Sequence, residues 1–186
     1  MERIIRTVTE KHRAAALDFV ERVFAEYDSA REGRFVRRLV EEIRAGRYHV
    51  PELELMMADE TDAIIGYAMF SRFPLEGKHE NELLLLTPVA VKTELQRRHI
   101  SRDLLEYGMK KAAALGFRAA IVEGDPRNYR ARGFETAADH GILPGPTVHL
   151  PHIDCLMAAP LVPGGLEGIC GTVDYSLYPC LLEEGE

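Results

Sequence analysis

The sequence contains no tryptophan, only three cysteines and no long apolar segment. Because three cysteines cannot build a disulfide framework, and an odd number leaves one unpaired, we expect reduced thiols and a cytoplasmic protein. Apolar runs such as Leu83–Leu86 are far below the length that crosses a bilayer, so we expect no membrane partner. The opening stretch MERIIRTVTEKHR lacks the apolar core of a signal peptide, and none is expected.

Positive charge is also scarce. Lys and Arg number 23 against 30 Asp and Glu, which gives a net charge of −7 at pH 7. A protein that holds nucleic acid by its phosphates needs a basic surface, so this balance argues against a nucleic-acid partner. It is compatible with a cationic substrate. Hydrophobic residues make up 46% of the 186 residues, which is enough for the core of one globular domain.

The spacing of apolar residues predicts which segments are strands. We expect strands at Ile4 to Val8, Leu53 to Met57, Ala63 to Phe70, Leu83 to Val91, Phe117 to Glu123, from Phe134, at His152 to Ala159 and at Cys170 to Tyr175. The run from Leu83 to Val91 is apolar on both faces, which is typical of a central strand, and Pro88 removes one backbone donor from it. The strand at Leu53 to Met57 is predicted to be half-buried, because Leu53, Leu55 and Met57 alternate with Glu52, Glu54 and Met56.

Helical spacing fills the intervals between these strands. We expect helices from the N-cap Thr9 to Tyr27, from Phe35 to Gly46 after a loop at Asp28 to Gly33, from the residues after Leu95 to Gly116, and a short one that Asp125 caps and Pro126 begins. This order predicts an α/β (α+β) domain with a twisted mixed β-sheet flanked by helices.

One segment joins a strand directly to a helix, from Leu86 to Ser101. The first N–H groups of a helix have no partner within it, and its dipole favours anions at that end. Arg97 and Arg98 stand there although cations oppose the dipole, which an anion such as a phosphate would explain. The alternative is that both arginines are solvated loop residues. Tyr129, in a tight helix between two glycine-marked turns, is by itself most simply a packing residue.

Together, VAVKTELQRRHIS and GDPRNYRARGF resemble the GNAT N-acetyltransferase superfamily. In that family a strand ending in hydrophobic-Ala-Val precedes Q/R-x-x-G-x-G/A, and a tyrosine precedes a Gly-Phe pair. GDPxxY…GF is similar to the motif of a bacterial group of predicted acetyltransferases. The resemblance implies one GNAT domain over residues 1–186, with its core in about 1–160 and a C-terminal extension after it. It also implies acetyl transfer from acetyl-CoA to a primary amine of a small molecule or a protein, by direct attack in a ternary complex.

The resemblance also implies which residues form the site. The backbone of Val89, Ala90 and Val91 would pair with the pantetheine arm and polarise the acetyl carbonyl. The pyrophosphate would be bound by Gln96, Arg97, Arg98, His99, Ile100 and Ser101. Tyr129 holds the position of the tyrosine that protonates the leaving CoA thiolate, and no metal is implied.

The sequence departs from the family pattern in the pyrophosphate loop. Arg97, His99 and Ser101 stand where the group usually has glycine, which lets phosphates approach the backbone closely. In one interpretation, Arg97, Arg98 and a protonated His99 replace backbone contacts with charge-assisted hydrogen bonds. In the other, the loop is degenerate and the chain is a catalytically silent module that binds a ligand or partner.

Several questions stay open at the level of sequence. Direct attack requires a deprotonated amine, and Glu82 and Glu123, both at strand ends, are the candidate bases. We expect the acceptor site in the loop Asp28 to Gly33, the turn Arg72 to Asn81 and the segment after Gly141. His149 and His152 would point to opposite faces of a strand, so we expect no metal there. A homodimer is one assembly open to the chain.

Overall fold

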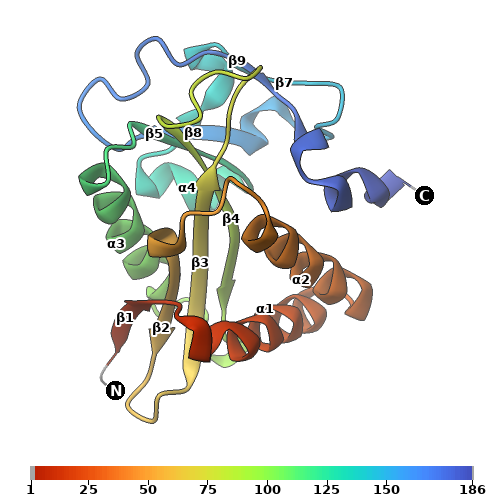
Figure 1. The fold of residues 1–186 in the computed structure, drawn as a ribbon, viewed down its shortest axis with the longest axis vertical. Coiled ribbons are helices and arrows are strands. Elements are labelled where there is room, and N and C mark those ends of the chain that lie inside the picture. The colour runs from red at the N-terminus through yellow and green to blue at the C-terminus, as the bar shows by residue number, and fades with distance from the viewer. Residues whose placement is uncertain (1–2, 186) are drawn as a thin grey trace. The chain divides into compact units, whose positions relative to one another are not determined.

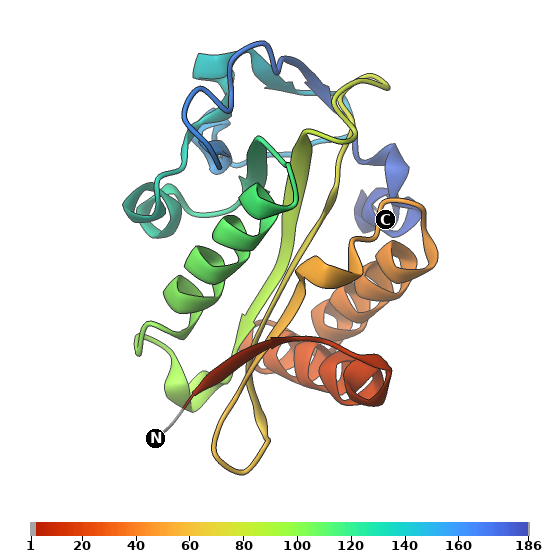
Figure 2. The same ribbon diagram turned by 60° about the vertical axis from the view of Figure 1, so that its left-hand side comes forward.

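The computed structural model describes residues 3–185. Its strands are β1 (Ile4–Thr7), β2 (Glu54–Ala58), β3 (Ile64–Arg72), β4 (Leu83–Val91), β5 (Ala119–Glu123), β6 (Glu135–Thr136), β7 (Ile142–Pro144), β8 (Leu156–Pro160) and β9 (Gly171–Val173). Its α-helices are α1 (Arg13–Tyr27), α2 (Ala30–Ala45), α3 (Ile100–Ala114) and α4 (Pro126–Tyr129). Among the described residues, a 7-stranded sheet has the order β1-β2-β3-β4-β5-β8-β6 and helices flank it, which confirms the predicted mixed sheet (Figures 1 and 2).

Contacts divide the chain into two compact units, which are described separately. The first comprises Met1–Phe70 and Thr87–Gly108. Here β1, β2 and β3 pair in antiparallel fashion, and α1 and α2 lie side by side in both ribbon views. The apolar stripes of these helices are buried, as their spacing predicts: Ala16, Phe19, Val20 and Val23 on α1, and Val36, Leu39, Val40 and Ile43 on α2. Tyr27, the last residue of α1, is 80% exposed.

Two glycines let helices of the first unit approach their neighbours closely. A Cβ on Gly66 of β3 would lie 2.6 Å from Ile100 Cγ2 and 2.8 Å from Leu104 Cδ1, both on α3. A Cβ on Gly33 of α2 would meet the carbonyl oxygen of Glu21 on α1 and lie 2.9 Å from Ala25 Cβ. The α1–α2 contact therefore leaves no space for a side chain at residue 33.

Replacing Gly33 with alanine is expected to destabilise the protein, although alanine is favoured over glycine inside a helix by about 1 kcal/mol. The added methyl group meets backbone, which cannot rotate away, and overpacking typically costs about 1–3 kcal/mol. We expect a net loss of up to about 2 kcal/mol in the free energy of unfolding, measured by urea denaturation. Gly46→Ala, at the open end of α2, is the control and should change it by less than about 0.5 kcal/mol. A stabilised Gly33→Ala protein would contradict the close packing.

The second unit comprises Ser71–Leu86 and Met109–Glu186. The strand β4 pairs with β5 in parallel from Leu83–Ala119 to Leu85–Ile121, and β4 itself continues to Val91, with a cis Thr87–Pro88 peptide. The later strand β8 pairs with both β5 and β6 in antiparallel fashion. A separate two-stranded parallel sheet joins β7 to β9.

Three sequence-based expectations about secondary structure are wrong. The loop expected at Asp28 to Gly33 is mostly helix, because Ser29 Oγ accepts a hydrogen bond from Glu32 N–H and α2 begins at Ala30. The strand β2 is buried along its whole length rather than on one face, so both faces of the sheet are covered at this strand. His152 lies outside β8, where it caps a 3-10 helix at Ile153–Cys155.

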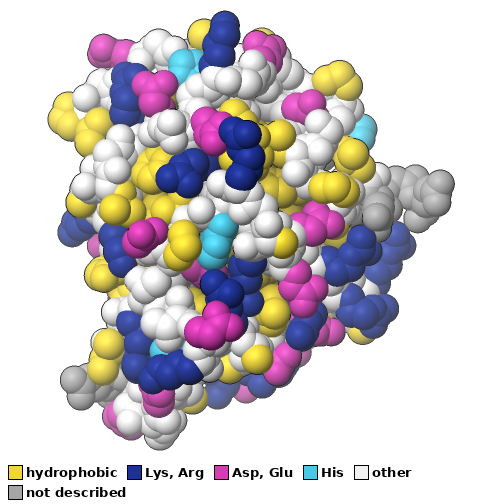
Figure 3. Space-filling model, in the orientation of Figure 1, with side chains coloured by type: hydrophobic (Ala, Val, Ile, Leu, Met, Phe, Trp, Pro, Cys, Tyr) yellow, Lys and Arg dark blue, Asp and Glu magenta, His cyan; other side chains and the backbone are white. Residues whose placement is uncertain are grey.

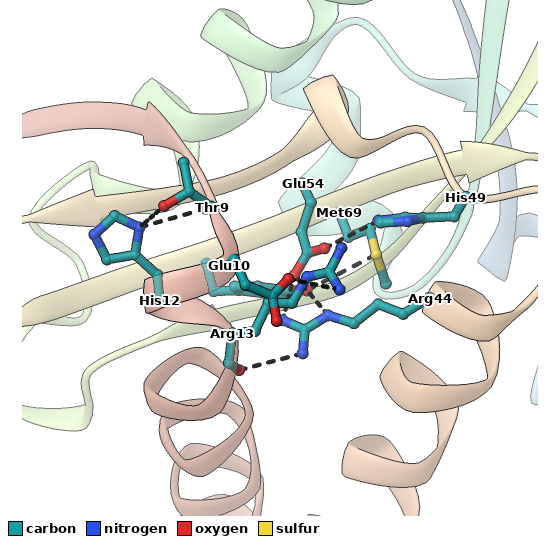
Figure 4. A network of polar contacts seen from close by, with 9 residues as sticks. Thr9, Glu10, His12, Arg13, Arg44, His49, Glu54 and Met69 are labelled. Carbon is teal, nitrogen blue, oxygen red and sulfur yellow. Dashed lines mark hydrogen bonds and ion pairs between the residues drawn. The ribbon is translucent and has the colours of Figure 1, made fainter.

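A buried polar network lies in the first unit, where the sequence predicts an exposed glutamate (Figure 4). The side chain of Glu54 is 2% exposed and accepts hydrogen bonds from Arg44 Nε at 3.0 Å and the Tyr67 hydroxyl at 2.9 Å. His49 Nε2 lies 3.0 Å from its second oxygen. Burial alone would raise the pKa of Glu54, but the hydrogen bonds from His49, Arg44 and Tyr67 and the charge of Arg44 lower it to about 2.

The described helices include none that is long and apolar enough to cross a membrane. On the face shown in Figure 3, Lys and Arg side chains lie among Asp and Glu side chains.

Candidate active site

The segment after β4 follows the path that the sequence predicts, a strand that leads through a short loop into a helix. A 3-10 helix spans Thr93–Leu95, and α3 begins at Ile100. Because α3 begins at Ile100 rather than at Gln96, the residues Gln96 to His99 are loop. They are all exposed, and Ile100 is buried. The loop therefore ends at a helix N-terminus, where backbone N–H groups lack partners within the helix.

The backbone of this loop has an unusual conformation. Arg97 has a φ of 61° and His99 a φ of 65°, so both side-chain-bearing residues are in the left-handed region that favours glycine. Each such residue costs about 1–2 kcal/mol relative to ordinary backbone. Gln96, before Arg97, is extended, while His99 directly precedes the first residue of α3. A left-handed residue beside a helical one turns successive N–H groups toward one side, as in an anion-binding nest.

Two side-chain contacts hold the loop in place. Arg3 Nη1 donates a hydrogen bond to the carbonyl oxygen of Arg98 at 2.8 Å. Thr93 Oγ1 donates one to Glu26 Oε2 at 2.6 Å, which ties the loop to the end of α1. Neither bond uses a backbone N–H of the loop, whereas the N–H of Gln96 donates to the carbonyl oxygen of Thr93 at 3.3 Å.

The candidate residues of the first unit thus form one continuous stretch of chain. The half-buried Val89 and Val91 flank the buried Ala90 at the end of β4, and Gln96 to Ser101 follow within the same unit. Tyr129 belongs to the second unit.

Tyr129 ends the short helix α4, whose start agrees with the predicted cap. Asp125 accepts a hydrogen bond from the backbone N–H of Arg127, and Pro126 occupies the first helical position. The Tyr129 ring packs edge-on against Phe134, with centroids 5.6 Å apart, and covers Gly124, where a Cβ would lie 2.5 Å from Cε2 of the ring. Burial raises the pKa of the Tyr129 hydroxyl, and the charge of Arg132 opposes this. The phenol is therefore protonated at neutral pH and able to donate a proton.

The two candidate bases have different surroundings in the second unit. The carboxylate of Glu82 contacts Arg118 Nη1 at 2.7 Å and His79 Nδ1 at 2.8 Å, and hydrogen bonds from His79 and then Arg118 lower its pKa. Glu123 is exposed at the end of β5, and Glu123 Oε2 accepts a hydrogen bond of 2.6 Å from the hydroxyl of Tyr175. Glu82 is thus suited to holding Arg118.

The contact between Glu123 and Tyr175 could not be predicted from the sequence. The two residues are 52 positions apart, and the sequence predicts only that Tyr175 ends the last strand. No motif links them, so only the fold brings the hydroxyl to the carboxylate. Among the described residues, no group of three or more His, Cys, Asp or Glu could hold a metal ion, and His149 and His152 form no such cluster.

Comparisons with known proteins agree with this fold. The model of the Acetyltransferase (GNAT) family matches residues 9–135. The uncharacterized N-acetyltransferase YhbS of Escherichia coli K12 is 28% identical over 126 residues, which are 66% of this chain and 71% of that protein. The crystal structure of E. coli YhbS in complex with CoA has a TM-score of 0.81 at 23% identity, over 94% of this chain and 90% of that chain. A GNAT family acetyltransferase from Brucella melitensis, solved with acetyl-CoA, has a TM-score of 0.71 at 20% identity, over 95% and 98% of the two chains.

Proposed function

Because this chain belongs to the acetyltransferase (GNAT) family, we propose that it transfers an acetyl group from acetyl-CoA to a primary amine. The observation that carries the proposal is the backbone of the loop from Gln96 to His99. Arg97 and His99 occupy left-handed conformations, so the loop keeps a glycine-like path although glycine is absent. The complexes of the E. coli and Brucella proteins with CoA and acetyl-CoA support the same ligand here.

The proposed binding mode uses backbone and charge together. N–H groups of Arg97 to Ser101 receive the pyrophosphate, and the side chains of Arg97, Arg98 and His99 add charge-assisted hydrogen bonds. The backbone of Val89, Ala90 and Val91 pairs with the pantetheine arm and polarises the acetyl carbonyl. No metal takes part in this scheme.

The proposed reaction is a direct transfer between two bound substrates, which lowers the barrier by holding them together. The amine loses a proton, its nitrogen forms a bond to the acetyl carbon, and the carbon–sulfur bond breaks. The leaving thiolate takes a proton from the Tyr129 hydroxyl, which recovers one from solvent, and the amide nitrogen releases its second proton. The products are an N-acetylated amine and CoA.

Calorimetric titration with acetyl-CoA tests this function, with desulfo-CoA as a second ligand. We expect a Kd in the micromolar range or tighter, which corresponds to about −8 kcal/mol. Absence of binding at millimolar acetyl-CoA would overturn the proposal. It would favour the second candidate function, a catalytically silent module with a degenerate loop. This candidate is supported by Arg97, His99 and Ser101, which stand where the family usually has glycine.

His99→Gly separates the two functions. If the imidazole binds phosphate, its loss removes a charge-assisted hydrogen bond, and we expect acetyl-CoA to bind about tenfold more weakly. The same exchange at the exposed His149 is the matched control and should leave the Kd unchanged. Tighter binding by His99→Gly would mean that the imidazole blocks the loop.

A further inference from the structure

The loop from Gln96 to His99 is held by a residue from outside the matched family region. The family model begins at residue 9, and Arg3 precedes it. Arg3 Nη1 donates a hydrogen bond of 2.8 Å to the carbonyl oxygen of Arg98, 95 positions away in the sequence. Because the donor carries a charge, this bond is stronger than one between two neutral groups.

The loop needs such support because its backbone conformation is unfavourable for the residues that it contains. Arg97 and His99 are left-handed, with φ values of 61° and 65°, on either side of Arg98. Residues with side chains keep this conformation only where the surrounding structure imposes it. Gln96 to His99 are all exposed, so packing in a core does not impose it. The bond from Arg3 reaches the residue between the two left-handed ones.

The bond from Arg3 also sets the direction of a backbone donor. The Arg98–His99 peptide is trans, so the carbonyl of Arg98 and the N–H of His99 point in opposite directions. With the carbonyl directed at Arg3, the N–H of His99 points away from Arg3. The carbonyl oxygen of His99 accepts the N–H of Asp103, in the first turn of α3, at 2.9 Å. Among residues 3–185, no protein group accepts the N–H of His99, which is therefore available to an anion.

Arg3 is anchored to the same compact unit as the loop. The strand β1 begins at the next residue, and its pairing with β2 starts at Ile4 and Ala58. The strand β2 pairs with β3, and β3 contacts the start of α3 at Gly66, where a Cβ would lie 2.6 Å from Ile100 Cγ2. Both partners of the bond therefore belong to one packed body, against which Arg3 can hold the loop.

We propose that Arg3 is a positioning residue for acetyl-CoA, which holds the Arg98–His99 peptide so that the N–H of His99 binds the pyrophosphate. This inference rests on the proposed acetyltransferase function. Arg3 acts through the Arg98 carbonyl and before the ligand binds, so that binding need not reorganise the loop. Its bond offsets the backbone cost that glycine would avoid at residues 97 and 99. The segment before the family region thus sets the affinity for ligands that carry a pyrophosphate.

The test compares the binding of acetyl-CoA with that of S-acetylpantetheine, which has the same thioester and pantetheine arm but no pyrophosphate. Arg3→Met removes the donor and keeps an unbranched side chain. We expect it to raise the Kd of acetyl-CoA, measured by calorimetry, about tenfold, the size of a lost charge-assisted hydrogen bond. The Kd of S-acetylpantetheine, measured by NMR titration in the millimolar range, should stay within about twofold, because this ligand has no group for the loop to bind.

Two further variants separate the hydrogen bond from a general effect of charge. Arg3→Lys keeps a charged donor for the one bond that the carbonyl accepts, and its Kd for acetyl-CoA should lie within about threefold of that of the unaltered protein. Arg6→Met is the matched control, because it removes the same charge from β1, where Arg6 pairs with Asp62. It should leave the Kd of acetyl-CoA unchanged.

The outcomes distinguish this inference from the function on which it rests. If the unaltered protein and Arg3→Met bind acetyl-CoA equally well, Arg3 does not position the loop and the inference is overturned. Equal weakening of both ligands would show a general distortion, and equal weakening by Arg6→Met or by Arg3→Lys would show that a donor at residue 3 is not the cause; each result overturns the inference. Failure of the unaltered protein to bind acetyl-CoA would instead remove the acetyltransferase function, and this inference with it.

Discussion

Replacing Glu54 with glutamine is expected to lower the free energy of unfolding by about 3–5 kcal/mol, the cost of leaving a buried charge without its partner. The side chain of Arg44 is only 9% exposed, and Glu54 accepts bonds from both Arg44 and Tyr67. An amide has the shape of the carboxylate but not its charge, so the guanidinium would remain buried and unneutralised. Urea denaturation at neutral pH measures the effect.

The exposed ion pair between α1 and α2 provides the control. Glu21 contacts Arg37 at 2.9 Å, but both side chains are about a third exposed, and Arg37 also contacts Asp18. Glu21→Gln makes the same exchange next to Arg37, which lies on α2 as Arg44 does. It should lower the free energy of unfolding by less than about 1 kcal/mol. Equal losses from Glu54→Gln and Glu21→Gln would contradict the buried network.

The Glu54 network also predicts how stability depends on pH. Its pKa is about 2 in the folded protein and about 4.5 in an unfolded chain, so folding favours the ionised form. The stabilisation is complete above pH 4.5 and is lost as the pH falls from there toward 2. A shift of this size corresponds to about 3 kcal/mol. Glu54→Gln should therefore flatten this part of the stability profile, whereas Glu21→Gln should not.

Tyr129→Phe is expected to lower turnover about 10²–10³-fold and to leave the Kd of acetyl-CoA within about twofold. General acid catalysis contributes typically 10²–10⁴-fold. A thiol has a pKa near 8.5 and a phenol near 10, and burial raises the pKa of Tyr129 further, so full proton transfer to the thiolate is uphill. This unfavourable step favours the lower part of that range for the loss in turnover.

Release of CoA from acetyl-CoA in the presence of 1,4-diaminobutane, followed with a thiol reagent, measures this loss. Tyr27→Phe, which removes a hydroxyl from a residue that is 80% exposed, is the control and should keep full turnover. Equal turnover of Tyr129→Phe and the unaltered protein would exclude Tyr129 as the acid and leave it a packing partner of Phe134 and Gly124.

Local patterns of the sequence predict several elements well. The strand expected at Leu83 to Val91 matches β4 in both bounds, and Asp125 and Pro126 begin α4 as expected. Both rest on chemistry that acts within a few residues: an apolar run bounded by polar residues, or a cap beside a proline.

Elements that depend on contacts distant in sequence are predicted poorly. The sequence predicts that Gly33 is a loop residue, but it lies inside α2, where α1 passes too close for a side chain. Alternation predicts that Glu54 faces solvent, yet its carboxylate is buried with Arg44 and Tyr67, which no spacing rule connects to it. The same limit applies to the site: a loop motif indicates Gln96 to Ser101, while the pairing of Glu123 with Tyr175 exists only in the folded chain.

The order of the sheet has a consequence for fragments of this protein. The strand β8 lies between β5 and β6 although it follows both in sequence, and it falls after residue 135, where the family model ends. A fragment cut there would keep β5, in which Ala119 to Val122 are buried, and lose the partner of one of its edges. An apolar edge strand with unpaired backbone groups recruits other chains and aggregates. The family region alone is therefore a poor choice for recombinant expression, and the residues through β8 belong to the smallest soluble unit.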